Sequence, residues 1–489
     1  MKRTSLTTAV IAGIAGVAGI SNMASAVYLN NDGLGSVLVY PYYTVNANNS
    51  TAITVVNTTS LGKAVKVRFL EAYDSREVLD FNLYLSPFDL WTAQVVSVGS
   101  GAGVFSNDNS CTVPALPKTA ASAVAFSTAA FDGRVTANDG GPKDVTRTLE
   151  GYVELIDMGS VIDAVKGQST LDAISHVGGV PASCAQVVKA WSGGGYWTSD
   201  SQIDITNVFG GLFGSGTIVN VGLGTIEGYN ADAIDQFYND QLAHHTAPSS
   251  LSPSIGSATA KTSYVFAPAG TGLPATLATT PYPVAVDAVS SLFMADSVFN
   301  EYWTSGGASA NSEWVVTFPT KRFYVDPVSI PGASSANIKP FDVKFSSVNG
   351  GTSCSPVNLN FYDREENTSS TGVDFSPLPT TGNALCYETQ VITFNQTKVP
   401  TAIFGSKLTA NINTGFNNGW AIIDLVGASP ANHVLTSTAS PNTFTGLPVT
   451  GFWVAQLVNG NIGGVLSNYS SLYRHKLHRT CTAAGVSCS

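Results

Sequence analysis

The chain has 489 residues, of which 44% are hydrophobic and only 11% are charged, and its formal net charge is −10. This length allows two or three domains with real cores, and the negative charge argues against binding to nucleic acid or anionic membranes, which need basic patches. Neutral polar residues take the place of charges and cost less to desolvate. We therefore expect a surface suited to meeting other protein surfaces, with simple solubility as the alternative explanation.

Residues 1–26 have the pattern of a secretory signal peptide. Lys2 and Arg3 give a positive start, residues 9–20 form a short apolar run, and Ala24–Ala26 is a small-x-small cleavage site. The run is too short and too rich in Gly and Ala for a stable membrane anchor, and no later segment reaches eighteen consecutive apolar residues. We expect a bacterial protein that is cleaved after Ala26 and exported, with no transmembrane segment in the mature chain.

The mature chain begins with an apolar, aromatic strand over Val37–Tyr43. Pro41 removes one backbone donor, which favours an edge strand or a strand end. Such a strand pairs either inside its own domain or with an identical neighbouring subunit by strand addition. Five of its side chains are the candidate subunit interface of a homopolymer: Val37, Val39, Tyr40, Tyr42 and Tyr43.

Alternating residues predict antiparallel strands through the rest of the N-terminal half, residues 27–150. Val65, Val67 and Phe69 alternate with the charged Lys66 and Arg68, which is typical of a strand with one buried and one wet face. Four strands are predicted in this way: Ala52–Asn57, Ala64–Ala72, Val78–Leu85 and Trp91–Val98. We expect them to form half of an antiparallel β-sandwich.

Two loops in this half are rich in side-chain oxygens: Asn107-Asp108-Asn109 and Asn138-Asp139-Gly140. Such Asx-rich segments most often form turns, but oxygen-rich loops of exported proteins also bind calcium. Neither loop has the spacing of an EF-hand. No cofactor motif is present, so calcium is the one cofactor that the sequence leaves open, and no metal ligands are assigned.

Residues 151–312 are predicted to be a mixed insertion that contains helices, between two β halves. Residues 148–157 and Ile218–Gly228 have the composition of strands, and residues 249–283 that of a loop. Helices are expected over three segments: Ser160–His176, Asn230–His245 and Asp287–Trp303. The second is the clearest, because Asn230 is a suitable N-cap and apolar residues follow on one helical face.

An aromatic cluster within this insertion is the candidate glycan-binding site. Trp191, Tyr196 and Trp197 lie in the segment WSGGGYW, and exposed aromatic rings can stack on the sugars of cell-envelope glycans, as could Tyr42 and Tyr43. A loop that folds back onto the core explains the same residues equally well.

Alternation of apolar and polar residues returns in residues 313–489, which we predict to be the second, β-rich half. The segment Tyr473–Arg479 is the only basic cluster. We expect a solvated tail held by a disulfide; the alternative is that it binds an acidic patch of a neighbour or anionic envelope polymers.

Six cysteines in an exported chain indicate disulfides, and pairing of sequence neighbours gives Cys111–Cys184, Cys354–Cys386 and Cys481–Cys488.

Four stretches together resemble an uncharacterised family of exported proteins of Gram-negative bacteria, often described as cell-surface proteins. The stretches are Val65–Glu71 with Leu83–Asp89, Gly151–Glu154, Tyr229–Ala233 and Trp314–Tyr324. The resemblance covers most of the mature chain. It implies export and a location at the cell surface, and it implies no activity and no functional residues.

Catalytic signatures are missing from the sequence. Gly214-Ser215-Gly216 is not a nucleophile elbow, and the adjacent His244 and His245 have no metal-binding spacing, so we expect them to cap the end of a helix. Carboxylates are present at Glu71, Asp74, Glu154, Glu365 and Glu366, but only their separation in space would indicate glycoside hydrolysis.

We expect a non-enzymatic structural protein that self-assembles as an extracellular filament or surface layer; an adhesin or glycan-binding module is the alternative, and an exported hydrolase comes third.

Overall fold

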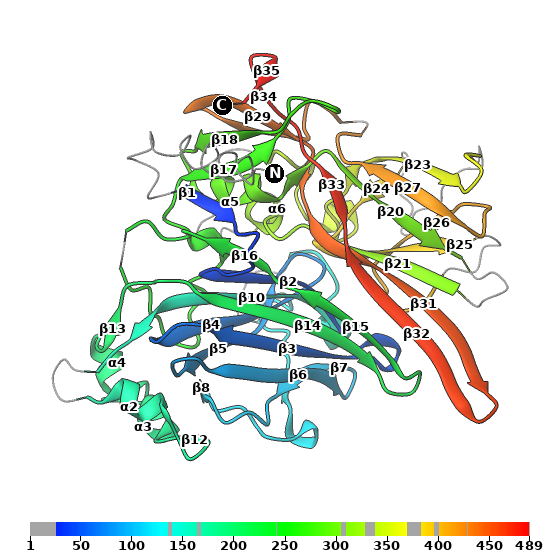
Figure 1. The fold of residues 1–489 in the computed structure, drawn as a ribbon. Helices are drawn as coiled ribbons and strands as arrows, with labels where there is room; N and C mark the ends of the chain where they lie inside the picture. The colour runs from blue at the N-terminus through cyan, green and yellow to red at the C-terminus, as the bar shows by residue number, and fades with distance from the viewer. Residues whose placement is uncertain are drawn as a thin grey trace, which may run out of the picture.

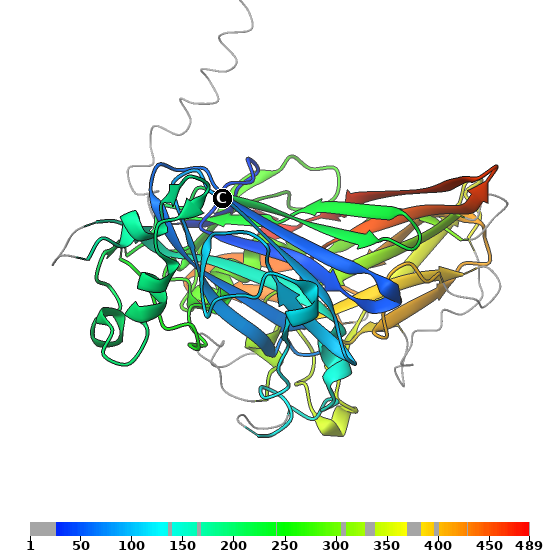
Figure 2. The same ribbon diagram turned by 90° about the horizontal axis from the view of Figure 1, so that it is seen from below.

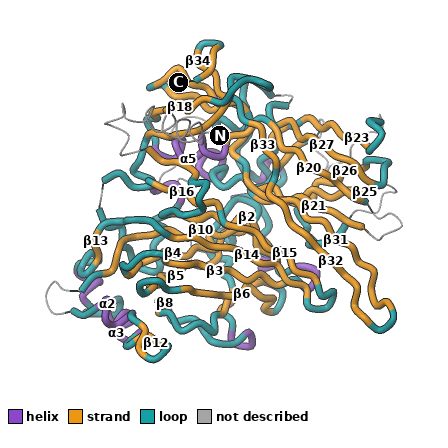
Figure 3. The backbone as a smooth tube through the Cα atoms, in the orientation of Figure 1, coloured by secondary structure: helices purple, strands orange, loops and turns teal. Residues whose placement is uncertain are grey.

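The computed structural model describes residues 26–134, 139–163, 168–240, 242–304, 310–327, 338–368, 383–395, 401–427 and 429–488. Strands are the main regular structure of these residues and far outnumber the helices, and the sheets are largely antiparallel (Figures 1 and 3). The prediction of a mainly β, sandwich-like protein is therefore confirmed. The predicted signal peptide lies outside the described residues except for Ala26, which begins the first strand.

Two sheets form the N-terminal part. The larger one, sheet B, has the strand order β18 (Thr276–Pro281), β17 (Thr262–Ala267), β1 (Ala26–Leu29), β16 (Asp232–Asp235), β2 (Val37–Thr44), β10 (Glu150–Val161), β4 (Gly62–Glu71), β5 (Glu77–Leu85) and β8 (Cys111–Val113), with β13 (Ile205–Thr206) beside β10. The other, sheet C, has the order β15 (Thr225–Asn230), β14 (Leu212–Asn220), β3 (Ser50–Asn57), β6 (Leu90–Val98), β7 (Gly101–Phe105) and β9 (Val124–Ala125).

Two further sheets form the C-terminal part. Sheet F has the order β23 (Asn358–Asp363), β27 (Asn418–Asp424), β20 (Ser297–Trp303) and β33 (Lys476–His478), and sheet G has the order β26 (Thr409–Asn413), β25 (Thr389–Asn395), β21 (Ala310–Thr317), β31 (Thr450–Ile462) and β32 (Val465–Arg474). Both contribute to one core, for example through Tyr302, whose ring stacks on Phe394 with centroids 5.2 Å apart. A smaller sheet joins β28 (Val434–Ser437), β29 (Ser440–Thr445), β34 (Cys481–Ala483) and β35 (Val486–Ser487).

Short strands and helices complete the described chain. The paired short strands are β11 (His176–Val177) with β12 (Val180–Pro181), β19 (Met294–Ala295) with β30 (Leu447–Pro448), and β22 (Ser355–Pro356) with β24 (Ala384–Leu385). The α-helices are α2 (Thr170–Ile174), α3 (Cys184–Ala190), α4 (Tyr196–Ser199), α5 (Ala285–Phe293) and α6 (Arg322–Val325). None of the described helices has the length and apolar character needed to span a membrane.

The central strands of sheet B are buried on both faces because they form the middle layer of the molecule. On one face, Leu38 and Tyr40 pack in a core shared with sheet C. On the other, Val39 and Ile156 pack in a core shared with α5 and the C-terminal sheets. Strands β2, β4 and β10 are consequently buried along their whole length.

The burial of β4 on both faces corrects the prediction that this strand has one solvent-exposed face. Lys66 and Arg68 are buried, and each is neutralised by an ion pair: Lys66 Nζ lies 3.0 Å from Asp80 Oδ2, and Arg68 Nη1 lies 2.7 Å from Glu154 Oε2. The segment after residue 245 covers them, since Lys66 Nζ also donates to the carbonyl of Ala247 at 2.7 Å. A strand with a solvent-exposed face and a strand whose charged face is buried in ion pairs have the same alternation of charged and apolar residues, so the sequence pattern does not distinguish them.

The prediction of an edge strand at β2 is wrong. Strand β2 lies between β10 and β16, and Pro41 is accommodated at a β-bulge: Tyr43 pairs with Gly151 and Tyr40 with Val153, so two residues of β2 face one of β10. The short β16 pairs only with residues 37–39 of β2, so the missing N–H of Pro41 breaks no bond on that side.

The helix predictions for the middle of the chain are largely wrong. The segment 230–245 forms the end of β15 and then β16, and its remaining described residues are irregular. Ala233 faces one core and Ile234 the other. Adjacent apolar residues of this kind have the spacing expected of an amphipathic helix, which explains the wrong prediction. Of Ser160–His176 only α2 is helical in the described residues, and α5 covers only the start of Asp287–Trp303, which continues into β19 and β20. The expected loop at 249–283 contains β17 and β18.

The segment predicted to be an insertion is part of the sheets. The boundary placed at residue 150 coincides with the start of β10, which pairs with β2 and β4 of the N-terminal half. The boundary placed at residue 312 lies within β21. Strands β14 to β16 likewise extend sheets B and C.

Candidate functional site

The five residues proposed as a subunit interface do not lie at a surface. Val37, Val39, Tyr40, Tyr42 and Tyr43 are each 0% exposed. Tyr42 donates to Glu150 Oε2 at 2.8 Å and Tyr40 to the carbonyl of Thr54 at 2.7 Å. They hold the middle sheet against its neighbours, so this prediction of an interface, and the suggestion that Tyr42 and Tyr43 stack on sugars, are wrong.

The proposed glycan-binding aromatics also pack inward. Trp197 is 1% exposed; its ring stacks on Tyr84 with centroids 5.2 Å apart, and its Nε1 donates to the carbonyl of Ile203 at 2.8 Å. Trp191 is half-buried and donates to the Tyr84 hydroxyl at 2.8 Å. Tyr196, also half-buried, bonds Thr170 Oγ1 at 3.0 Å. The cluster joins helices α2–α4 to sheet B, as the alternative explanation of a loop folding back on the core expects.

His245 belongs to this cluster and does not cap a helix. Its Nδ1 donates to the carbonyl of Ser201 at 2.6 Å, its Nε2 lies 2.9 Å from the Tyr84 hydroxyl, and burial lowers its pKa to about 4. The adjacent His244 stacks on Tyr238 with centroids 3.8 Å apart. Both side chains are therefore held in place by rings and hydrogen bonds.

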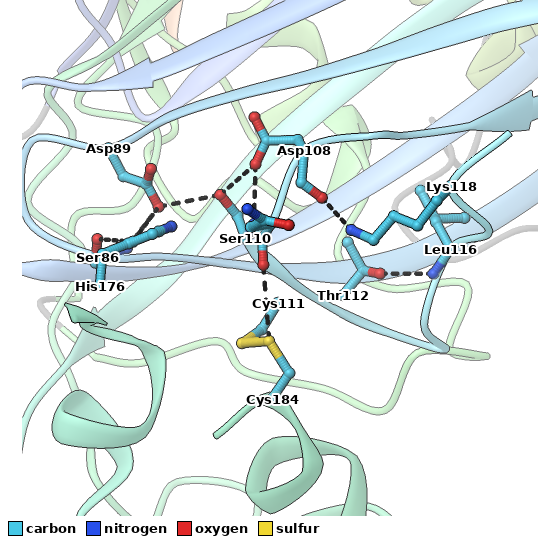
Figure 4. Close-up of a disulfide and its surroundings, with 11 residues drawn as sticks. Ser86, Asp89, Asp108, Ser110, Cys111, Thr112, Leu116, Lys118, His176 and Cys184 are labelled. Carbon is cyan, nitrogen blue, oxygen red and sulfur yellow. Dashed lines mark hydrogen bonds and ion pairs between the residues drawn. A yellow bond between two sulfur atoms is a disulfide. The ribbon is translucent and has the colours of Figure 1, made fainter. Parts of the chain in front are cut away.

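The three disulfides have the predicted partners. Cys111–Cys184 ties β8 to α3, Cys354–Cys386 ties the segments that carry β22 and β24, and Cys481–Cys488 closes the last hairpin. Figure 4 shows the first of them beneath an Asx turn in which Asp108 Oδ1 accepts the Ser110 amide at 2.9 Å.

The two oxygen-rich loops are used by the fold in different ways. Ser110 Oγ bridges Asp108 and Asp89, at 2.8 and 3.2 Å (Figure 4), while Asn138 lies outside the described residues and Asp139 is ion-paired to Arg147. Among the described residues no group of three or more His, Cys, Asp or Glu side chains is placed to hold a metal ion. Calcium at either loop stays a prediction.

Three of the candidate catalytic carboxylates belong to buried charge clusters. Glu71 accepts the amides of Tyr73, Asp74 and Arg76 at 2.7, 3.1 and 2.8 Å and pairs with Arg147, whose Nε lies 2.8 Å from Glu71 Oε2. Glu154 is paired with Arg68 as described above. Glu365 and Glu366 lie elsewhere, at the exposed turn after β23. The ion pairs give Glu71 and Glu154 a structural role.

Asp74 and Glu388 are the least satisfied members of the buried charged groups. Both side chains are buried, and neither carboxylate accepts a hydrogen bond from the described residues. Arg76 Nε is 3.5 Å from Asp74 Oδ2. Burial raises the pKa of Asp74 well above its usual range and that of Glu388 to about 8, the latter opposed by the charge of Lys321.

The hairpin β31–β32 carries several exposed apolar side chains that lie close to one another. It projects from the body beside the β14–β15 hairpin (Figures 1 and 2). The exposed fractions are 59% for Ile462, 65% for Val465, 62% for Tyr469 and 52% for Tyr473. Ile462 pairs with Val465 across the turn, and Tyr473 stacks on Trp453 with ring centroids 5.0 Å apart.

The two faces of β32 have different surroundings. Alternation places Asn468, Ser470 and Leu472 on one face, where Ser470 Oγ donates to the carbonyl of Ile226 at 2.9 Å and Asn468 Nδ2 to that of Leu223 at 2.7 Å. This face therefore lies against β15. The opposite face carries Val465, Tyr469 and Tyr473 and continues the core face of sheet G beyond the part that sheet F covers; we call it, with Ile462, the hairpin face.

The sequence gives one signal for the hairpin face. Residues 450–473 contain no Asp, Glu, Lys, Arg or His, although the chain as a whole has a formal charge of −10. The dipeptide Asn459-Gly460 is typical of a turn, but it forms a bulge inside β31, and the strand runs on to Ile462.

The basic cluster is not a solvated tail. Tyr473 and Arg474 end β32, and Lys476–His478 form β33, which pairs with β20. His475 is buried, with Nε2 2.6 Å from the carbonyl of Val315. The segment is part of the C-terminal sheets, and Arg474, Lys476 and Arg479 line a cavity that is described below.

Comparisons with protein-family models, with curated proteins and with solved structures give no match for this chain.

Proposed function

We propose that this chain is an exported structural protein that self-assembles on the bacterial cell surface as a filament or a surface layer, and that the hairpin face makes the contact between identical subunits. The single observation that carries the proposal is the exposed apolar surface of the hairpin face, on a segment without charges. Three disulfides support an oxidising compartment outside the cytoplasm.

Electrostatics favours this surface over others as the contact between copies. Two copies with a formal charge of −10 each repel one another, and a contact is least costly where neither side brings charges that must be desolvated. The hairpin face meets this condition over its whole length, and Tyr469 and Tyr473 are of the residue type that is enriched at the centre of protein interfaces.

A contact between the hairpin face and a different surface of the next copy is heterologous. If its rotation does not close a ring, repetition of the contact produces a fibre or sheet from one kind of subunit. Strand addition at β15 is not needed for this contact. The Ser470 hydroxyl already bonds the backbone N–H and carbonyl of Ile226 in β15.

Lysine substitutions on the hairpin face test the proposal. We expect V465K/Y469K to remain monomeric in sedimentation velocity under conditions in which the unmodified protein assembles. Burying two unpaired ammonium groups at the contact would cost roughly several kcal/mol. Both side chains are exposed in the monomer, so circular dichroism and the unfolding midpoint should stay unchanged.

The matched control is V177K/V348K, which adds the same charge at exposed valines far from the hairpin in sequence and on other elements. It should assemble like the unmodified protein. Assembly of V465K/Y469K at the same concentration as this control would show that the hairpin face is not the contact.

A further inference from the structure

A cavity of about 660 Å³ lies where the N-terminal and C-terminal parts meet. Its walls come from the loop after β1, from β16 and β17, from α5, and from the segments around β33. This volume is in the range of sites for small molecules and short oligomers, roughly 300–1,000 Å³. Neither the disulfides nor the hairpin face involves it.

One wall of the cavity is basic. Arg474, Lys476 and Arg479 line it, and the carboxylates that line it are Asp32 and Asp232. Asp232 is already engaged, by an ion pair with Arg474 and a hydrogen bond from Thr450. The lining therefore has a formal excess of one positive charge, in a chain whose formal charge is −10.

Arg479 is a partly buried cation of this wall whose Nε has no hydrogen-bond partner. Its Nε is buried and has no hydrogen-bond partner, and no ion pair joins its guanidinium to a carboxylate among the described residues. Burial lowers its pKa, which the more distant Asp232 and Asp296 oppose. Guanidinium groups remain charged in proteins, so this wall holds a partly buried cation whose Nε donor is unused.

The remaining lining combines aromatic rings with amide side chains. Tyr264, Phe266 and Phe299 line the cavity together with Asn30 and Asn31. Phe266 is 67% exposed, so its ring is accessible to a ligand. Aromatic rings can cover the C–H face of a sugar ring, while amides donate to and accept from hydroxyl groups.

From these walls we infer that the cavity binds an acidic saccharide, a sugar that carries a carboxylate or phosphate group. Arg479 and Lys476 bind the acid group, since a guanidinium donates two parallel hydrogen bonds to a carboxylate or phosphate. The aromatic wall covers the ring, and Asn30 and Asn31 bind hydroxyl groups. The inference is independent of self-assembly, because the cavity does not include the hairpin face.

Titration calorimetry of the monomeric hairpin variant V465K/Y469K with defined sugars tests the inference. The probes are trigalacturonic acid for the carboxylate, glucose 1-phosphate for the phosphate, maltotriose as the neutral sugar, and inorganic phosphate as an anion without a sugar. We expect at least one acidic sugar to bind about tenfold or more tightly than maltotriose and inorganic phosphate, and its affinity to fall with added salt.

Variants assign the binding to the cavity. K476Q and R479M should each weaken binding of that sugar about tenfold or more, whereas K189Q, at an exposed lysine on α3, should leave the affinity unchanged. Lys476 is exposed, so K476Q keeps the test valid if R479M folds poorly. Equal affinity for maltotriose, unchanged affinity in K476Q, or no binding of either acidic sugar would overturn the inference.

Discussion

Glu388 shows how a single buried side chain makes stability depend on pH. Its carboxyl group is buried without a hydrogen bond among the described residues, close enough to Lys321 and Glu71 for their charges to act on it. Burial raises its pKa from 4.5 to about 8. The folded state therefore binds the proton more tightly than the unfolded state, and the stability from this group is present below pH 4.5 and is lost as the pH rises toward 8.

We expect E388Q to be more stable than the unmodified protein at pH 8 and of similar stability at pH 4.5. The amide cannot ionise, so the gain should grow with pH to roughly a few kcal/mol, given about 1.4 kcal/mol for each pKa unit. Urea unfolding of both proteins at several pH values measures it. E365Q, at an exposed carboxyl, is the control and should change little; a difference for E388Q that does not vary with pH would refute the pKa assignment.

At the level of residues, the sequence predicts which side chains form disulfides, but it does not show which charged side chains are buried by distant parts of the chain. Cys111–Cys184 and the other disulfides follow from the pairing of sequence neighbours. The burial of Lys66 could not be predicted, because the carbonyl of Ala247 that receives its ammonium comes from a distant part of the chain. Arg479 could be recognised as part of a basic cluster, but only the cavity shows that it lacks a partner.

The positions of the long strands in residues 27–161 follow from the sequence whether one face is buried, as in β3 and β6, or both faces, as in β2 and β4. Strand β3 alternates strictly between buried and partly exposed residues, and β6 does so over its first six residues. Strand β16 has apolar residues toward both cores, which imitates a helix. Pro41 lacks an N–H group, which predicts an edge strand or a strand end, but a bulge removes the need for this donor in the middle layer.

The helices α2–α4 depend on one aromatic residue, which gives a prediction at this scale. We expect W197A to lower the free energy of unfolding by about 3–5 kcal/mol, the cost of deleting a fully buried tryptophan, because its ring packs on Tyr84 and His245. W420A removes a tryptophan that is 42% exposed and should cost clearly less. Equal losses for the two variants in denaturant unfolding would contradict the packing role of Trp197.

For the whole molecule, the order of strands could not be predicted from the sequence. β1 pairs in parallel with β17 and antiparallel with β16, so the start of the described chain lies between segments more than two hundred residues further on. Such long-range pairing makes sheet B the middle layer and leaves the hairpin β31–β32 projecting (Figure 1). The uncharged run at residues 450–473 is visible in the sequence, but its exposure is a property of the fold.

Self-assembly is the central claim, and negative-stain electron microscopy of the purified, signal-cleaved protein tests it most directly. Grids are prepared over a range of protein concentrations, with and without calcium. The account predicts ordered fibres or sheets built from one kind of subunit. Dispersed single particles at every concentration, in both buffers, would contradict it.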